Sequence, residues 1–448
     1  MEGFMQQQST YNRNMAAVKF LACSIIGIFL FFIKVPLGGE MKIPIDYIVG
    51  VIRGHLENYL PWLVLAISAY GVIDTFFLRK TYRLNKTNKI MAAIRTMGLF
   101  VVAMAAFRIG PAAIIADDMA PYCLNILGGS VGLTVMVGTL ILPLLIDYGL
   151  ANAIGVLVRP IMRPLFKVPG RTAVVAMTSY FGNYSLGHIG IENMYKKGQI
   201  TGKESVIVGT GFATASIVNF MVFANMLGIM EYWNQYFLLV TVVTFAITAI
   251  TIRLYPIRGK KDDYYPGVTP EPEPEYSKNI LKNAWEEGIR TAGNAPAMLK
   301  NTADQIKNGI NILGSLLPVS MCFMVAALLL QRYTPVFTWI GYLFYPLFKL
   351  VGMPDLKVVL DATGTSLVDI MMVTSVGAQA IHSGVNLAMT TRFFLAALPV
   401  TMIVFFAGFV PCILSTQIPI KIHELAALWF IRVALTILFV GVFGLIFL

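Results

Sequence analysis

Uncharged polar side chains are concentrated in one apolar stretch, within the string YFGNYSLGHIG at residues 180–190. Polar groups are costly inside a membrane and tend to mark the path of a substrate. Amide, hydroxyl and imidazole groups at this spacing can exchange hydrogen bonds with a small polar solute. The alternative is that they bond only within their own segment. The candidate solute-binding residues here are Asn183, Tyr184, Ser185 and His188.

A second polar cluster lies in the other half of the chain, in a stretch with the same small and polar character. Its candidate residues are Thr365, Ser366 and Asp369, followed by Ser375, Gln379 and His382. Asn219 is a further candidate, because it stands in a long uncharged stretch near Thr214 and Ser216. An amide there offers two donors and an acceptor to a base or amide ligand. Packing between helices explains Asn219 equally well.

Two charged residues within apolar stretches are further candidates. Asp147 follows Pro143 and is the best candidate for coupling to Na⁺ or H⁺, because an intramembrane carboxylate can bind a cation or carry a proton. Pairing with a neighbouring backbone or basic group is the alternative. Arg432 is expected either to pair with a carboxylate or to line a cavity. No cofactor beyond such an ion is expected.

An intramembrane enzyme is a rival interpretation, because Ser185 and His188 lie three residues apart. Helical spacing often creates such pairs, however, and no orienting third group, HExxH signature or GxSxG elbow accompanies this one. The four cysteines, at positions 23, 123, 322 and 412, lack the paired spacing of a zinc site or disulfide set. We therefore predict that the protein is not an enzyme and holds no metal.

The composition is that of a membrane protein. Of 448 residues, 57% are hydrophobic and only 13% are charged, whereas soluble domains carry about 25% charged residues. The net charge of +11 does not indicate nucleic-acid binding, because the basic residues crowd into short segments between apolar runs. The first apolar run is a full span without a cleavage site, so we expect it to remain as an anchor.

Nine stretches are long and apolar enough to span a bilayer as helices, so we predict an all-α polytopic fold with about nine transmembrane helices. Lys and Arg in the connecting loops favour a cytoplasmic N-terminus. Residues 334–350 are expected to be interfacial, although a tenth span there would move the C-terminus to the other side. The nine stretches are residues 15–33, 60–78, 91–107, 129–157, 205–230, 236–252, 310–330, 393–416 and 425–448.

An internal repeat organises the chain. The string PLFKVPG at residues 164–170 recurs as PLFKLVG at residues 346–352, and in each half it is followed by a Gly- and Ser-containing segment and a long uncharged stretch. Three spans separate the copies, so the second should enter from the opposite face, as an inverted repeat. We predict three N-terminal helices (1–128), repeat 1 (129–256), a cytoplasmic linker with a Pro/Glu run and a surface helix (257–308), and repeat 2 (309–448).

Residues 172–199 and 355–384 are too rich in Gly, Ser, Thr and Asn for ordinary spans and too apolar for solvated loops. We expect each to be a helical hairpin that enters the membrane and returns on the same side. Irregular backbone at that depth must be buried in protein or line a cavity, so the tips should face a solute. A closely packed helix pair is the alternative.

At YFGNYSLGHIG, followed by GTGFATASIVNFMVFANM, the chain resembles the bacterial Gate-domain ("nucleoside recognition") membrane proteins, and in overall plan their YjiH-like branch. The order of hairpin, broken helix and inverted repeat is similar to the core of the concentrative nucleoside transporters. The resemblance implies a nucleoside or similar small polar solute. Gate segments also occur in GTP-dependent ferrous-iron transporters, but the GxxxxGK[ST] phosphate loop is absent from this sequence.

We therefore predict ion-coupled or passive transport of a small polar solute by alternating access. The alternative is a non-transporting assembly or signalling subunit that acts with a second Gate-type protein, and an intramembrane enzyme is a weaker one. The expected partners are the lipid bilayer, the solute, and a second Gate-type protein or a further copy of this chain.

Overall fold

The computed structural model describes residues 12–37, 40–80, 86–182, 184–273, 279–296, 298–414 and 416–447. These residues are mostly helical, and the strands among them form one short antiparallel hairpin of β1 (Val35–Leu37) and β2 (Glu40–Lys42). The prediction of an all-α fold is therefore confirmed, with this hairpin as a small addition.

Long apolar helices establish the protein as a multi-pass membrane protein. Within the described residues, six helices are long and apolar enough to cross a bilayer. One of them is longer than the span expected at 60–78, because it begins at Pro44. Helices α2, η1, α3 and η2 follow one another without a break, and α2 adds a more polar first half. The helices involved are α1 (Arg13–Phe32), α2 (Pro44–Leu56), η1 (Glu57–Tyr59), α3 (Leu60–Ile73), η2 (Asp74–Leu78), α4 (Lys86–Phe107), α14 (Trp233–Thr251), α16 (Met298–Tyr333) and α23 (Ile422–Phe447).

Three of the expected spans are interrupted. In the first, Leu133–Ile146 and Leu150–Phe166 meet at an angle of 57°, at Gly149, whose positive φ of 97° suits glycine. The stretches 205–230 and 393–416 are not continuous helices but unwind in their middles. The pieces are α7 (Leu133–Ile141), α8 (Pro143–Ile146), α9 (Leu150–Ile161) and η5 (Met162–Phe166); α12 (Gly202–Gly211) and α13 (Ile217–Met226); and α21 (Met389–Thr401) and α22 (Phe409–Leu414).

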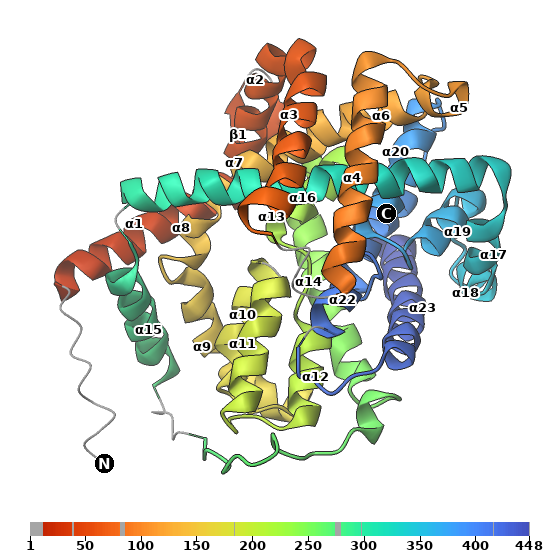
Figure 1. Cartoon of the computed structure of the whole chain (residues 1–448). Helices are drawn as coiled ribbons and strands as arrows, with labels where there is room; N and C mark the ends of the chain where they lie inside the picture. The colour runs from red at the N-terminus through yellow and green to blue at the C-terminus, as the bar shows by residue number, and fades with distance from the viewer. Residues whose placement is uncertain are drawn as a thin grey trace.

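Two helical hairpins precede the unwound helices. Hairpin 1 is formed by α10 (Thr172–Phe181) and α11 (Tyr184–Lys196), and hairpin 2 by α19 (Leu356–Thr365) and α20 (Ile370–His382). At 1.5 Å per residue their arms are roughly 15 to 20 Å long, shorter than the roughly 30 Å hydrocarbon core. The order of hairpin, unwound helix and long helix thus occurs twice, as α10 to α14 and as α19 to α23 (Figure 1).

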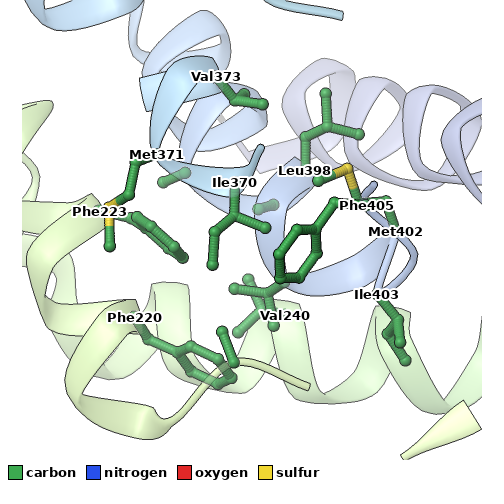
Figure 2. Packing of buried hydrophobic residues seen from close by; sticks show 14 of the residues in the cluster. Phe220, Phe223, Val240, Ile370, Met371, Val373, Leu398, Met402, Ile403 and Phe405 are labelled. Carbon is green, nitrogen blue, oxygen red and sulfur yellow. The ribbon is translucent and has the colours of Figure 1, made fainter. Parts of the chain in front are cut away.

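The two halves interlock. Helix α11 of hairpin 1 packs against α22, and α20 of hairpin 2 packs against α13. Figure 2 shows this second contact, where Phe220 and Phe223 of α13 meet Ile370 and Met371 of α20, with Phe405 close by. Each hairpin is therefore in contact with the unwound helix of the other half.

The segment between α14 and α15 lies across the base of hairpin 1 (Figure 1). The Gly202 N–H donates to the Asp263 carbonyl at 2.8 Å, and Arg163 pairs with Glu273 at 2.6 Å. A hollow of about 400 Å³ lies between this segment and residues that flank hairpin 1 in the chain, among them Arg171 and Gln199. The expected surface helix is α15 (Ile280–Asn294), which packs against α1 and α9, and α16 then continues without a break past the predicted boundary at residue 309.

Short helices complete the described chain. They are α5 (Ala112–Ile115), α6 (Ala120–Asn125), η4 (Ile126–Gly132), η6 (Met230–Tyr232), η7 (Ile257–Gly259), α17 (Val336–Tyr342) and α18 (Tyr345–Leu350). The last two cover residues 334–350 with pieces too short to span a bilayer.

Helix α17 supports hairpin 2 through an approach so close that only glycine fits. A Cβ atom at Gly364 would lie 1.9 Å from the Phe337 carbonyl oxygen, and one at Gly341 would lie 2.1 Å from that of Leu360. Between them, the Thr338 hydroxyl donates to the buried carboxylate of Asp361. The position of hairpin 2 thus depends on this contact.

Gly364→Ala should therefore displace hairpin 2. The methyl group meets a backbone carbonyl that cannot move independently, and overpacking of this kind costs about 1–3 kcal/mol. Thermal unfolding in detergent should show a clear loss of stability. The matched control is Gly50→Ala in α2, where a Cβ would meet no atom within 4 Å; equal stability of the two variants would contradict the tight contact.

Candidate functional site

The first unwound helix leaves backbone carbonyls without helical partners, and side chains from neighbouring helices bind them. The His188 Nε2 atom lies 3.0 Å from the Gly209 carbonyl oxygen, and the Thr248 hydroxyl lies 2.9 Å from that of Gly211. Both carbonyls belong to the last turn of α12, where the final four C=O groups have no partner within the helix. Hairpin 1 and α14 therefore hold this helix end in place.

The unwound residues 212–216 are joined to the tip of hairpin 1. The Thr214 hydroxyl donates to the Tyr180 carbonyl at 3.0 Å, and the Ser216 hydroxyl to that of Phe181 at 3.5 Å. Ser216 also caps α13, accepting from the Val218 N–H at 3.3 Å. These hydroxyls satisfy the free carbonyl end of α10, which explains small polar residues at this break.

The second half makes the same connection with backbone groups. The N–H groups of Phe406 and Ala407, in the unwound residues 402–408, donate to the carbonyls of Leu367 and Val368 at 3.0 and 2.8 Å. Leu367 and Val368 form the tip of hairpin 2, between α19 and α20. Each hairpin tip is thus hydrogen-bonded to the unwound segment of its own half.

The tip of hairpin 1 also reaches the unwound segment of the other half. The Tyr184 ring lies 5.7 Å from that of Phe405 and 6.0 Å from that of Phe409, and the His188 ring lies 4.9 Å from that of Phe409. Residues 402–408 consequently lie between the two tips. The structure brings the two predicted polar clusters together around this segment.

Most polar residues of the first cluster contact the protein itself. The two ring nitrogens of His188 lie beside the Gly209 carbonyl and the Cys412 sulfur, the latter at 3.5 Å, so the ring is not directed at Ser185 as a general base would be. Ser185 lies within hydrogen-bonding reach of Cys412. Asn183 lies outside the described residues.

Most of the second cluster is buried, and several of its side chains bond within hairpin 2. The Thr365 hydroxyl donates to the Ala362 carbonyl at 2.8 Å, and Asp369 caps α20 by accepting from the Met371 N–H at 2.8 Å. Ser366 receives a hydrogen bond from the Trp429 indole at 3.1 Å. Ser375 bonds back to its own helix, whereas Gln379 and His382 lie farther along it, near Asp118 and Tyr122. These contacts give Thr365, Ser366 and Ser375 a structural role in this conformation.

Asn219 differs from the other candidates. It lies in the first turn of α13, just after the break, and is half-buried while its neighbours in that helix are almost all buried. Its side-chain amide has no hydrogen bond to a described residue. It therefore combines a position beside the unwound segment with unused donors and an acceptor.

Asp147 lies at the bend between α8 and α9, where Gln305 of α16 donates to its carboxylate at 3.3 Å. Its neighbour Ile146 is close to the tip of hairpin 1, since a Cβ at Gly182 would lie 3.3 Å from Ile146 Cδ1. A coupling role for Asp147 remains a prediction. Among the described residues there is no group of three His, Cys, Asp or Glu side chains suited to a metal ion.

Sequence reasoning missed the second unwound segment and some of the residues that hydrogen-bond near the two breaks. The break at 402–408 was hidden inside an apolar stretch, although Pro399, Gly408 and Pro411 were visible signals of interruption. The sequence does not indicate the roles of Thr248 and Trp429, because their hydrogen-bond partners, Gly211 and Ser366, are distant in sequence.

Thr214→Val should weaken the junction between hairpin 1 and the first break. The substitution keeps the shape but leaves the buried Tyr180 carbonyl without this donor, at a cost of about 1–3 kcal/mol in the free energy of unfolding. Thr210→Val is the matched control, because the equally buried Thr210 hydroxyl bonds back to the Val206 carbonyl of its own helix. Thermal unfolding should separate the two variants, and a similar loss in both would refute the junction.

Comparison with known proteins finds a family model that matches the central segment of the chain. The model of the family described as "Gate: Nucleoside recognition" matches residues 129–230, which contain hairpin 1 and the first unwound helix. An uncharacterised protein of Alkalihalophilus pseudofirmus, BpOF4_10220, is 27% identical over 436 residues, covering 94% of this chain and 92% of its own length.

Solved structures that match this chain include CNTnw in an inward-facing substrate-bound state. The match has a TM-score of 0.44 at 12% identity, and it covers 99% of this chain and 94% of the CNTnw chain. A doubly substituted CNTnw in an outward-facing state matches with a TM-score of 0.45 at 14% identity, over the same shares of both chains. Membership of the YjiH-like branch stays a prediction. Residues 129–230 of this chain match the model of the Gate ("nucleoside recognition") family.

Proposed function

We propose that this protein transports a small polar, nucleoside-like solute across the membrane by alternating access. The observation that carries the proposal is the meeting of two hairpin tips with two unwound helices inside an apolar bundle. Irregular backbone at membrane depth occurs where it is buried in protein or lines a solute cavity. Discontinuous helices are the usual place of solute sites in secondary transporters.

The tips are suited to act as gates because, among the described residues, few hydrogen bonds join each tip to the unwound segment of its own half. Two hydroxyl donors join hairpin 1 to its break, and two backbone N–H groups join hairpin 2 to its own. A solute that offers donors and acceptors of its own can replace such bonds as a tip moves. The interlocked halves then allow one hairpin to open while the other stays closed.

Asn219 is the residue we place first in the solute site, because its amide lies beside the break and is not used within the described structure. An amide can pair with the edge of a nucleobase through one donor and one acceptor, which agrees with the family description of residues 129–230. Tyr184 of hairpin 1 offers an aromatic face on which a base can stack. The other predicted residues of the two tips would contribute once the tips separate.

The two halves are proposed to be inverted repeats, residues 129–256 and 309–448, joined by the cytoplasmic segment. The proposal places the protein in the bacterial inner membrane with its N-terminus in the cytoplasm, as the basic loop residues favour.

A non-transporting subunit is the second candidate function, and one observation favours it. Thr365, Ser366 and Asp369 are hydrogen-bonded within hairpin 2 and buried. Polar tips that stay packed in this way would hold a second Gate-type protein or a further copy of this chain rather than a solute.

The test is thermal unfolding of the purified protein against a panel of nucleosides, nucleobases, dipeptides and organic acids. A ligand that binds only the folded state adds about 2.7 kcal/mol at a hundredfold excess over its Kd. We expect nucleosides or nucleobases to raise Tm and Asn219→Leu to abolish the shift.

The control is Asn225→Leu, an equally half-buried asparagine six residues along the same helix and so on another face. It should keep the ligand shift. A panel without any shift, or a shift that survives Asn219→Leu, would count against the proposed site and favour the subunit.

A further inference from the structure

Arg432 connects the two unwound helices at their free carbonyl ends. Its Nε atom donates to the Thr401 carbonyl at 2.8 Å, and Thr401 is the last residue of α21. Its Nη1 atom lies 3.3 Å from the Thr248 hydroxyl. That hydroxyl in turn lies 2.9 Å from the carbonyl of Gly211, the last residue of α12, and 2.8 Å from the Thr244 carbonyl of its own helix. One guanidinium thus reaches both breaks, directly on one side and through a hydroxyl on the other.

This guanidinium is buried without an acidic partner. Arg432 is 1% exposed and lies within the long apolar helix α23. No carboxylate of a described residue pairs with it, and its Nη2 atom has no hydrogen-bond partner among those residues. Asp361 and Asp369, on hairpin 2, are engaged with Thr338 and the Met371 N–H instead.

The helix ends supply the missing negative charge. Each helix carries roughly half a negative elementary charge at its C-terminus, so two C-terminal ends facing one point offer roughly one. An arginine side chain stays protonated in proteins, and its single positive charge matches that sum. A bound Na⁺ ion would meet the same groups, since unwound carbonyls and half-helix C-terminal ends are its usual ligands in secondary transporters.

We propose that Arg432 is a built-in cation that joins the two unwound helices and fills the place a coupling Na⁺ would occupy, so that this chain binds its solute without Na⁺. The last clause rests on the proposed function. The placement of the Arg432 charge does not depend on the proposed function, because it concerns the folded protein alone. Arg432 is thus a positioning residue for both unwound segments.

The experiment compares Tm of the wild-type protein, Arg432→Met and Arg432→Lys in equimolar NaCl and N-methyl-D-glucamine chloride. The wild type should show no Na⁺-specific shift. Arg432→Met, which keeps the length but loses the charge, should lower Tm by a few degrees, because it leaves the Thr401 carbonyl and the Thr248 hydroxyl without this donor. Arg432→Lys, which keeps the charge, should lower Tm much less than Arg432→Met does. The control Arg253→Met, at an exposed arginine at the end of α14, should change Tm little.

A rescue experiment separates the charge from simple packing. Arg432→Ala leaves space beside the Thr401 carbonyl and the Thr248 hydroxyl, so methylguanidinium should raise its Tm while choline does not. The proposal is overturned if Arg432→Met is as stable as the wild type, or if the wild type shows a saturable Na⁺-specific shift. If the Met and Ala variants fail to fold, the wild-type Na⁺ comparison and the Lys variant still decide the question, and neither needs the solute.

Discussion

The need to satisfy backbone polar groups inside an apolar bundle governs this structure. Two helices unwind inside an apolar core, and each freed carbonyl or N–H must find a partner there. The carbonyl ends of α12 and α21 are bound by His188, Thr248 and Arg432. The unwound segments are joined to the hairpin tips by Thr214, Phe406 and Ala407. The positions of both hairpins follow from these bonds.

The same constraint links fold to function. Because each unwound segment is bonded to its own hairpin and packed against the other half, a change at one tip alters the surroundings of both breaks. The apolar contacts seen in Figure 2, between α13, α20 and Phe405, keep the halves together while the polar bonds are few. The region between the halves can therefore exchange its hydrogen bonds within the protein for hydrogen bonds to a solute, as a solute site requires.

Much of the architecture follows from the sequence. Hydropathy predicts a polytopic helical protein, and small polar residues predict the positions of both hairpins. The break at 402–408 was not predicted, because its partners Leu367 and Val368 are backbone groups that leave no mark on composition. The polar tips also proved more internally bonded than a solute site suggests: Thr365 and Asp369 satisfy local backbone groups that periodicity does not reveal.

The central claim is that hairpin 1 must separate from the second unwound helix for solute to pass. Helix α11 packs against α22, and Ser185 of α11 interacts with Cys412 of α22, so Ser185→Cys is the variant in which we expect a disulfide to join the two helices. The measurement is nucleoside uptake into proteoliposomes by this variant, oxidised and then reduced, with wild-type protein treated identically. The account predicts uptake that the disulfide stops and reduction restores. Uptake that continues unchanged with the disulfide formed would contradict it.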